Sequence, residues 1–154
     1  MVRVDWSNWE PGDKDVESIV LESGWIEKKL KDQNIDGPNL NNLDLNKASK
    51  LVGEKIAEGK GQRDMVKALI QGMEMGKEQA EFLAMFIFSA GVSERDLLQA
   101  AETATKVQWL AGCCDLCDQN ENVMLEPGKK FPSGHIAPPA CVNCLCCLSP
   151  AVVI

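Results

Sequence analysis

All seven cysteines of this 154-residue chain lie after residue 112, and four of them form two C-x2-C pairs. Cys114 and Cys117 make the first pair, Cys141 and Cys144 make the second, and 23 residues separate the two pairs. Two residues between cysteines allow a tight turn that points both sulfurs the same way, so two pairs can bring four thiolates onto one tetrahedral ion. Soft thiolates in that array favour zinc. The spacing therefore predicts one zinc ion on these four cysteines, with Cys146 as an alternative ligand.

Three cysteines exceed the four that one zinc ion needs, namely Cys113, Cys146 and Cys147. An iron–sulfur cluster could also use four thiolates, although no ferredoxin spacing occurs here. Disulfides are the main alternative to a metal, and they gain weight if the protein ends up outside a reducing cytosol. From the residues alone, zinc is the preferred prediction and disulfides remain open.

The other residue types offer no convincing catalytic arrangement. His135 is the only histidine, and its simplest interpretation is an exposed loop residue. A nucleophilic Cys–His pair is disfavoured because thiols grouped at metal-ligand spacing are usually ligands. The phosphate-binding, dinucleotide-binding, nucleophile-elbow and zinc-protease motifs are all missing from the sequence. We therefore expect no enzymatic activity.

The charge distribution argues against nucleic acids as partners. The chain carries 16 basic and 23 acidic side chains, a net charge of -7, and its excess acidity lies in residues 1–45. A surface that binds polyphosphate needs clustered lysine and arginine, which this sequence lacks, so no autonomous nucleic-acid binding is expected. The N-terminus has no apolar signal core, and the apolar run at 82–88 is too short to span a bilayer. We expect a soluble, unexported protein.

Hydrophobic spacing upstream of the cysteines predicts helices. A helix capped by Asp13 or Asp15 should run over residues 16–30, with Gly24 as a possible break. Ser93, an acidic residue three positions later and an apolar staple predict the start of another helix, which should reach about Leu110. Three further helices are expected at 46–59, 66–76 and 77–89.

The predicted fold class is mainly α, with a helical body of four or five helices followed by a small cysteine-rich module that a metal or disulfides hold together. Three segments follow from the composition: an acidic N-terminal arm and first helix at 1–45, the helical body at 46–112 and the cysteine-rich module at 113–154. A module of that size is only marginally stable without cross-links. Trp109 and Phe131 are expected to form a small core around the cysteines.

After Trp109 the chain carries the Cys114/Cys117 pair, a Phe-Pro-Ser-Gly element at 131–134 and a Pro-Pro-Ala element at 138–140 before its last cysteines. This order resembles the end of the phage head morphogenesis proteins typified by the phage Mu protein F family. That family has a tryptophan at a helix end, a C-x2-C pair, a Phe-Pro-Ser-Gly element, and a Pro-Pro-Ala element before its last cysteines. Two positions depart from the pattern, because Cys141 replaces the family's histidine and Leu145 replaces its arginine. The matching residues are Trp109; Cys114 and Cys117; Gly128; Phe131, Pro132, Ser133 and Gly134; Pro138, Pro139 and Ala140; and Cys141, Cys144 and Cys146.

The resemblance covers about 45 residues and implies a minor head protein of the virion. Such a protein would associate with the portal protein, the major capsid protein or both during head assembly in the bacterial cytoplasm, and it would be present in several copies in the head. The cysteine-rich module would then act as a rigid docking element, since bound metal can supply the free energy of folding. The alternative is a zinc-ribbon-like binding or regulatory module unrelated to virion assembly.

Overall fold

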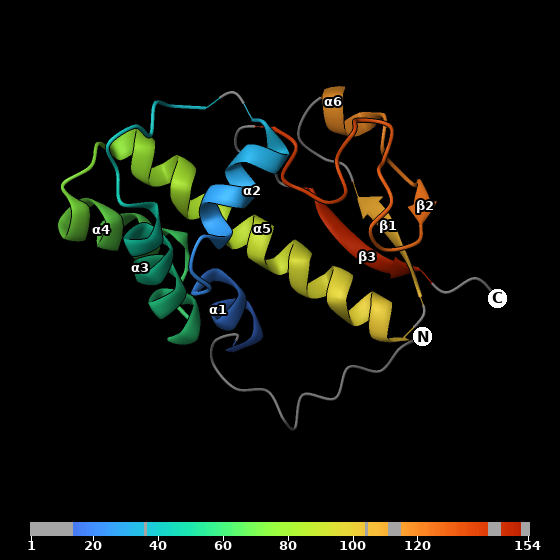
Figure 1. The fold of residues 1–154 in the computed structure, drawn as a ribbon, viewed down its shortest axis with the longest axis horizontal. Coiled ribbons are helices and arrows are strands. Elements are labelled where there is room, and N and C mark those ends of the chain that lie inside the picture. Colours follow the sequence, from blue (N-terminus) through green and yellow to red (C-terminus); the bar gives the residue numbers. More distant parts are fainter. Residues whose placement is uncertain (1–13, 36, 104, 111–114, 142–145, 152–154) are drawn as a thin grey trace.

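The computed structural model describes residues 14–35, 37–103, 105–110, 115–141 and 146–151, and it is mainly helical with a small sheet (Figure 1). Among these residues five helices precede the first strand, at the upper end of the predicted four or five. The predicted arm before residue 14 lies outside the described residues. The elements are α1 (Lys14–Val20), α2 (Trp25–Gln33), α3 (Leu45–Ala57), α4 (Gln62–Met73), α5 (Lys77–Thr103), β1 (Lys106–Leu110), α6 (Asp115–Asp118), β2 (Met124–Leu125) and β3 (Cys147–Ala151).

Helices occur in the first three predicted segments, but α4 runs from Gln62 to Met73 rather than from 66 to 76. Asp15, predicted as one of two possible caps, lies inside α1, and Asp13 lies outside the described residues. Gly24 separates α1 from α2 and has a φ of 81°, a left-handed conformation that favours glycine. The side chain of Asp44 caps α3 by accepting a hydrogen bond from the backbone N–H of Lys47. The predicted apolar stripes of α3 and α4 are buried in part through Val52, Ile56 and Leu69.

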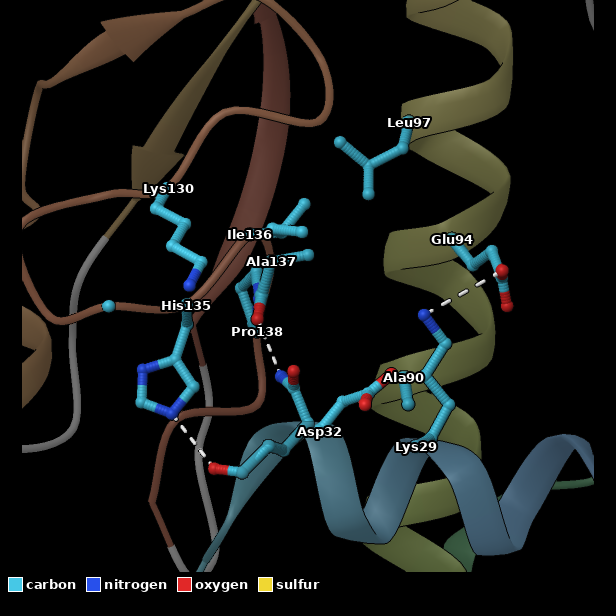
Figure 2. A pocket seen from close by; sticks show the side chains of 12 residues that line it. Lys29, Asp32, Ala90, Glu94, Leu97, Lys130, His135, Ile136, Ala137 and Pro138 are labelled. Carbon is cyan, nitrogen blue, oxygen red and sulfur yellow. Dashed lines mark hydrogen bonds and ion pairs between the residues drawn. The ribbon is translucent and has the colours of Figure 1, made fainter.

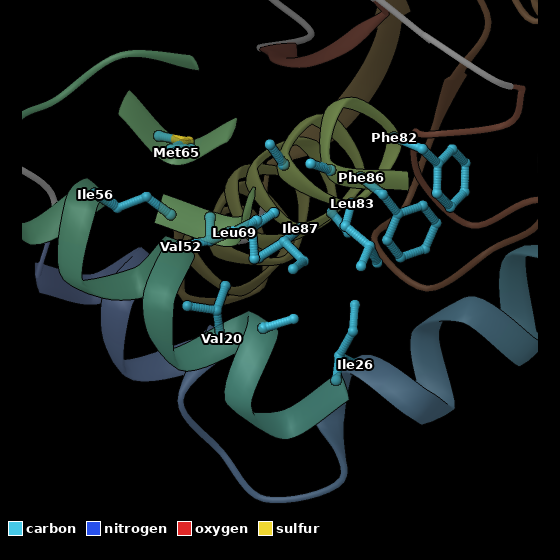
Figure 3. Packing of buried hydrophobic residues seen from close by; sticks show 14 of the residues in the cluster. Val20, Ile26, Val52, Ile56, Met65, Leu69, Phe82, Leu83, Phe86 and Ile87 are labelled. Carbon is cyan, nitrogen blue, oxygen red and sulfur yellow. The ribbon is translucent and has the colours of Figure 1, made fainter. Parts of the chain in front are cut away.

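Helix α5 is the central element of the fold. It packs against α1, α3 and α4 on one side and against β3 on the other (Figure 1). Figure 3 shows Leu83, Phe86 and Ile87 of α5 meeting Val52 of α3 and Leu69 of α4 in a single apolar cluster. A helix that is apolar nearly all round must be covered on several faces, and α5 meets that requirement in its first half.

One continuous α5 replaces the two helices that the sequence predicted at 77–89 and from Ser93. The predicted helix start at Ser93 is wrong, because Ser93 is 3% exposed and lies inside α5. Neighbouring Glu94 accepts a hydrogen bond from the indole N–H of Trp25 and pairs with Lys29 of α2. This part of α5 therefore makes contacts between helices and does not begin a new helix.

The predicted helical course to Leu110 is also wrong, because residues Lys106–Leu110 form β1. Strand β1 lies in the middle of the sheet, between the antiparallel strands β2 and β3. Val107 and Trp109 are buried on one face of β1, while Lys106 and Leu110 are exposed. Alternation with a period of two is the pattern of a strand that buries one face.

A close approach of helices α1 and α5 occurs at Gly91. A Cβ atom at this position would lie 2.9 Å from a methyl carbon of Val16 and 2.9 Å from one of Val20. Both valines are buried, so neither can move aside freely. Glycine is therefore required here by packing, although it weakens the interior of a helix by up to about 1 kcal/mol relative to alanine.

Gly91→Ala is accordingly expected to lower the free energy of unfolding by about 1 kcal/mol, since overpacking costs about 1–3 kcal/mol and outweighs the gain in helix propensity. Urea unfolding followed by circular dichroism measures the change. Gln99→Ala, at an exposed position of the same helix, is the control and should be neutral or slightly stabilising. A higher unfolding midpoint for Gly91→Ala would contradict the packing argument.

Of the helices in the described part of the chain, none combines the length and the apolar content that crossing a membrane requires.

Candidate functional site

Two of the predicted zinc ligands lie beside each other. Cys117 is carried by the short helix α6 and is fully buried, whereas Cys141 is half-buried and follows the segment 130–140. Their sulfur atoms are 3.9 Å apart. Zn–S bonds of about 2.3 Å at tetrahedral angles place two ligand sulfurs about 3.8 Å apart, whereas a disulfide bond is about 2.05 Å long. The separation of this pair is too long for a disulfide, and it fits both two ligands of one ion and two thiols in contact.

The remaining predicted ligands are described only in part. Cys114 and Cys144, together with Cys113, lie outside the described residues. The alternative ligand Cys146 is buried at 5% exposure, and Cys147 is exposed at the start of β3. Within the described ranges, no three histidine, cysteine or acidic side chains gather as a metal site. The four-cysteine zinc site stays a prediction, with Cys117 and Cys141 as its described half.

A second apolar cluster supports the cysteines, as the sequence predicted for Trp109 and Phe131. The two rings meet edge to face, with centroids 5.1 Å apart at 64°, and both are nearly inaccessible to solvent. Cys117 and Cys146 belong to the same cluster, as does Ala100 at the end of α5. The cluster thus joins the sheet, the cysteines and the last turns of α5.

A chain of hydrogen bonds leads from the cysteine pair to α2. The backbone N–H of Asn120 donates to the carbonyl of Cys117, at 2.9 Å. The fully buried side chain of Asn120 donates to Ser133 Oγ, at 2.7 Å, and accepts from the Ser133 backbone N–H, at 2.9 Å. Ser133 Oγ lies 3.0 Å from His135 Nδ1, and His135 Nε2 lies 2.9 Å from the carbonyl oxygen of Gln33.

These partners fix the protonated nitrogen of a neutral His135 ring. A carbonyl oxygen can only accept, so Nε2 carries the hydrogen that is donated to Gln33. Nδ1 then accepts from the hydroxyl of Ser133, and that hydroxyl accepts from Asn120. The interpretation of His135 as an exposed loop residue is therefore wrong, because it is half-buried and bridges two parts of the fold.

Ser133 and His135 have the separation of a nucleophile and its base, but their other partners favour a structural role. An activated serine needs its oxygen directed at a substrate. Here the oxygen of Ser133 is occupied by the amide of Asn120, and both ring nitrogens of His135 are engaged. The arrangement holds the segment 131–135 in place.

Gln33 completes the contact from the other direction. Its side chain is buried at 8% exposure, and its Nε2 donates to the carbonyl oxygens of Ala137 and Pro139, each at 2.7 Å. With the bond from His135 to the Gln33 carbonyl, three hydrogen bonds join one residue of α2 to the segment 135–139. We call this arrangement the Gln33 clasp. No sequence signal marked it, since an isolated glutamine at a helix end is normally a solvated residue.

A cleft of about 310 Å³ lies between α2, α5 and the segment 130–138 (Figure 2). Lys29 of α2 and Glu94 of α5 form an ion pair on one wall, at 3.7 Å, and Lys130 belongs to the opposite wall. The volume is at the lower end for ligand sites. Its two lysines and two acidic residues, Asp32 and Glu94, leave the lining of the cleft without net formal charge.

Comparisons with models of protein families, with curated proteins and with solved structures found no match for this chain. The resemblance to the phage Mu protein F family therefore stays a prediction, based on the residues of the C-terminal module.

Proposed function

We propose that this chain is a structural protein of a bacteriophage head, which associates with the portal or the major capsid protein during head assembly. Its C-terminal module, held by one zinc ion on Cys114, Cys117, Cys141 and Cys144 or Cys146, is the rigid docking element. The observation that carries the proposal is the contact of Cys117 with Cys141 at a core that contains several of the residues that carry the family resemblance, namely Trp109, Cys117, Phe131, Ala140 and Cys146.

The motif residues support a single compact module. Trp109 and Phe131 pack on each other, Cys117 and Ala140 lie in the same cluster, and Ser133 is held by Asn120. Motif residues that are far apart in the sequence therefore contribute to the same folded core. A motif whose parts share one core is more readily explained as a folding unit than as a chance succession of short sequence elements.

The surface of the module supports a docking role. The exposed large apolar side chains of the described residues include Leu110, Leu116, Met124 and Ile136, which are between 39% and 48% exposed. Apolar and methionine side chains on a rigid surface are suited to contact with another protein. Residues 113–154 contain only two basic side chains, Lys129 and Lys130, which makes nucleic acid a poor partner.

The proposal is tested by co-expressing this chain with affinity-tagged portal protein, or tagged major capsid protein, of the phage that encodes it. We expect the wild-type chain to copurify with one of the two. Leu116→Asp combined with Met124→Asp should reduce recovery by about tenfold, because charge is then placed in an apolar contact. Failure of the wild-type chain to copurify with either protein would overturn the proposal.

Leu98→Asp is the matched control for this experiment. Leu98 is 55% exposed on α5, outside the C-terminal module, so its replacement should leave recovery unchanged. Zinc content should be the same in all three proteins, which separates loss of a contact from loss of the fold.

A further inference from the structure

We propose that the Gln33 clasp couples the state of the Cys117–Cys141 pair to the C-terminal turn of α2 and to the cleft beside it. When the pair rearranges, as on loss of metal, the clasp opens and the last turn of α2 loosens. The inference rests on the proposed function in one respect, because loss of the proposed metal is the event that rearranges the pair. The hydrogen bonds of the clasp are all made by described residues.

The first connection starts at Cys117. Its carbonyl holds the backbone of Asn120, and the side chain of Asn120 holds Ser133 through two hydrogen bonds. Ser133 orients His135, which donates to the carbonyl of Gln33. Every link is a hydrogen bond of 3.0 Å or less, and Asn120 is fully buried. A shift of α6 therefore displaces the group that holds the end of α2.

The second connection starts at Cys141 and is shorter. Pro139, whose carbonyl accepts from Gln33 Nε2, lies two residues before Cys141 in the sequence. Ala137 to Ala140 are all buried, so the segment has little freedom to absorb a displacement of the cysteine. The backbone carbonyl of Cys117 and the buried chain before Cys141 thus lead to the same residue of α2 by separate routes.

The two bonds from the Gln33 side chain should break together because Gln33, Ala137 and Pro139 are all buried. One nitrogen, Gln33 Nε2, uses its two hydrogens for two carbonyl oxygens. If either carbonyl moves away, a buried N–H is left without an acceptor, which costs more than the hydrogen bond itself contributes. Release of the whole Gln33 side chain to water is then more favourable than keeping it half-bonded. The segment 135–139 loses its hydrogen bonds to α2 as a result.

Opening of the clasp has a local consequence in α2. Asn34 caps the C-terminus of the helix in a left-handed conformation, and its N–H donates to the carbonyl of Leu30 at 3.2 Å. The clasp holds the residue just before this terminus. Its loss should let the last turn fray and should change the shape of the cleft, because Gln33 and residues 135–138 all line it and the clasp holds them together.

Hydrogen exchange of the full-length protein, followed by mass spectrometry, tests the coupling. Chelation with phenanthroline under reducing conditions should speed exchange of the Asn34 amide by about tenfold, in parallel with the appearance of reactive thiols. In Gln33→Ala the same amide should exchange fast from the start, and chelation should add less than about twofold. Gln71→Ala, an exposed glutamine on α4, is the control and should behave as the wild type.

Two outcomes would overturn the proposal. If chelation exposes the thiols but leaves exchange at Asn34 unchanged, the pair and α2 are not coupled. If chelation exposes no thiols, the metal hypothesis fails, and Ser133→Ala then tests the coupling alone. This variant removes the hydroxyl between Asn120 and His135 and should speed exchange at Asn34 by about threefold or more. Unchanged exchange in Ser133→Ala would refute the role of the chain of hydrogen bonds.

Discussion

Replacing Cys117 with serine is expected to reduce the zinc content of the purified, reduced protein from about one ion per chain to less than about 0.1. A serine hydroxyl does not ionise at neutral pH and is a poor ligand for zinc, so one of four ligands is lost. Structural zinc sites supply about 10–16 kcal/mol of apparent binding free energy in small domains, which leaves a large effect to observe. Elemental mass spectrometry measures the metal directly.

Cys147→Ser provides the control for the metal measurement. Cys147 is exposed at the first position of β3 and is not among the predicted ligands, so its replacement should leave about one zinc ion per chain. Thiol titration before and after chelation adds a second observable, since ligated thiolates react only after the metal is removed. If the wild-type protein contains no metal, and its thiols react only after reduction, disulfides hold the module and the zinc hypothesis fails.

Periodicity in the sequence was sufficient for the helices that bury a single stripe. Val52, Ile56 and Leu69 repeat at helical spacing and lie in the core as predicted, and Gly24 interrupts the first helix. These features are local, because one helix face and one glycine determine them. The contact of Trp109 with Phe131 could also be predicted from the sequence, because aromatic residues beside cysteines in a small module have few other places to be buried.

Features that depend on partners distant in the sequence could not be predicted from the sequence in the same way. Ser93 has the local chemistry of a helix start, but contacts of α5 with α1 and α2 extend the helix through it. Val107 fits a helical stripe as well as a strand, and its pairing with Leu125 in β2 and Pro150 in β3 decides for the strand. Gln33 and Asn120 look like ordinary polar residues until their partners, 13 to 106 positions away, are known.

Trp109→Ala is expected to lower the free energy of unfolding of the C-terminal module by about 3–5 kcal/mol, the usual cost of removing a buried aromatic side chain. Trp109 is fully buried, contacts Phe131 edge to face and lies in the cluster that contains Cys117. Its replacement leaves a cavity next to the cysteine pair, so metal should also dissociate more readily on chelation.

The matched control for that variant is Leu110→Ala, on the neighbouring position of β1. Leu110 is 41% exposed and should lose about 1 kcal/mol or less, because a solvated side chain leaves little cavity. Denaturant unfolding of the full chain, with exchange of amides in β1 and β3 as the local readout, separates the two variants. An equal loss for both would mean that the sheet, and not the aromatic core, stabilises the module. A selective loss for Trp109→Ala would instead show that packing of the aromatic core stabilises the cysteine pair. Bound metal and this packing would then stabilise the pair jointly.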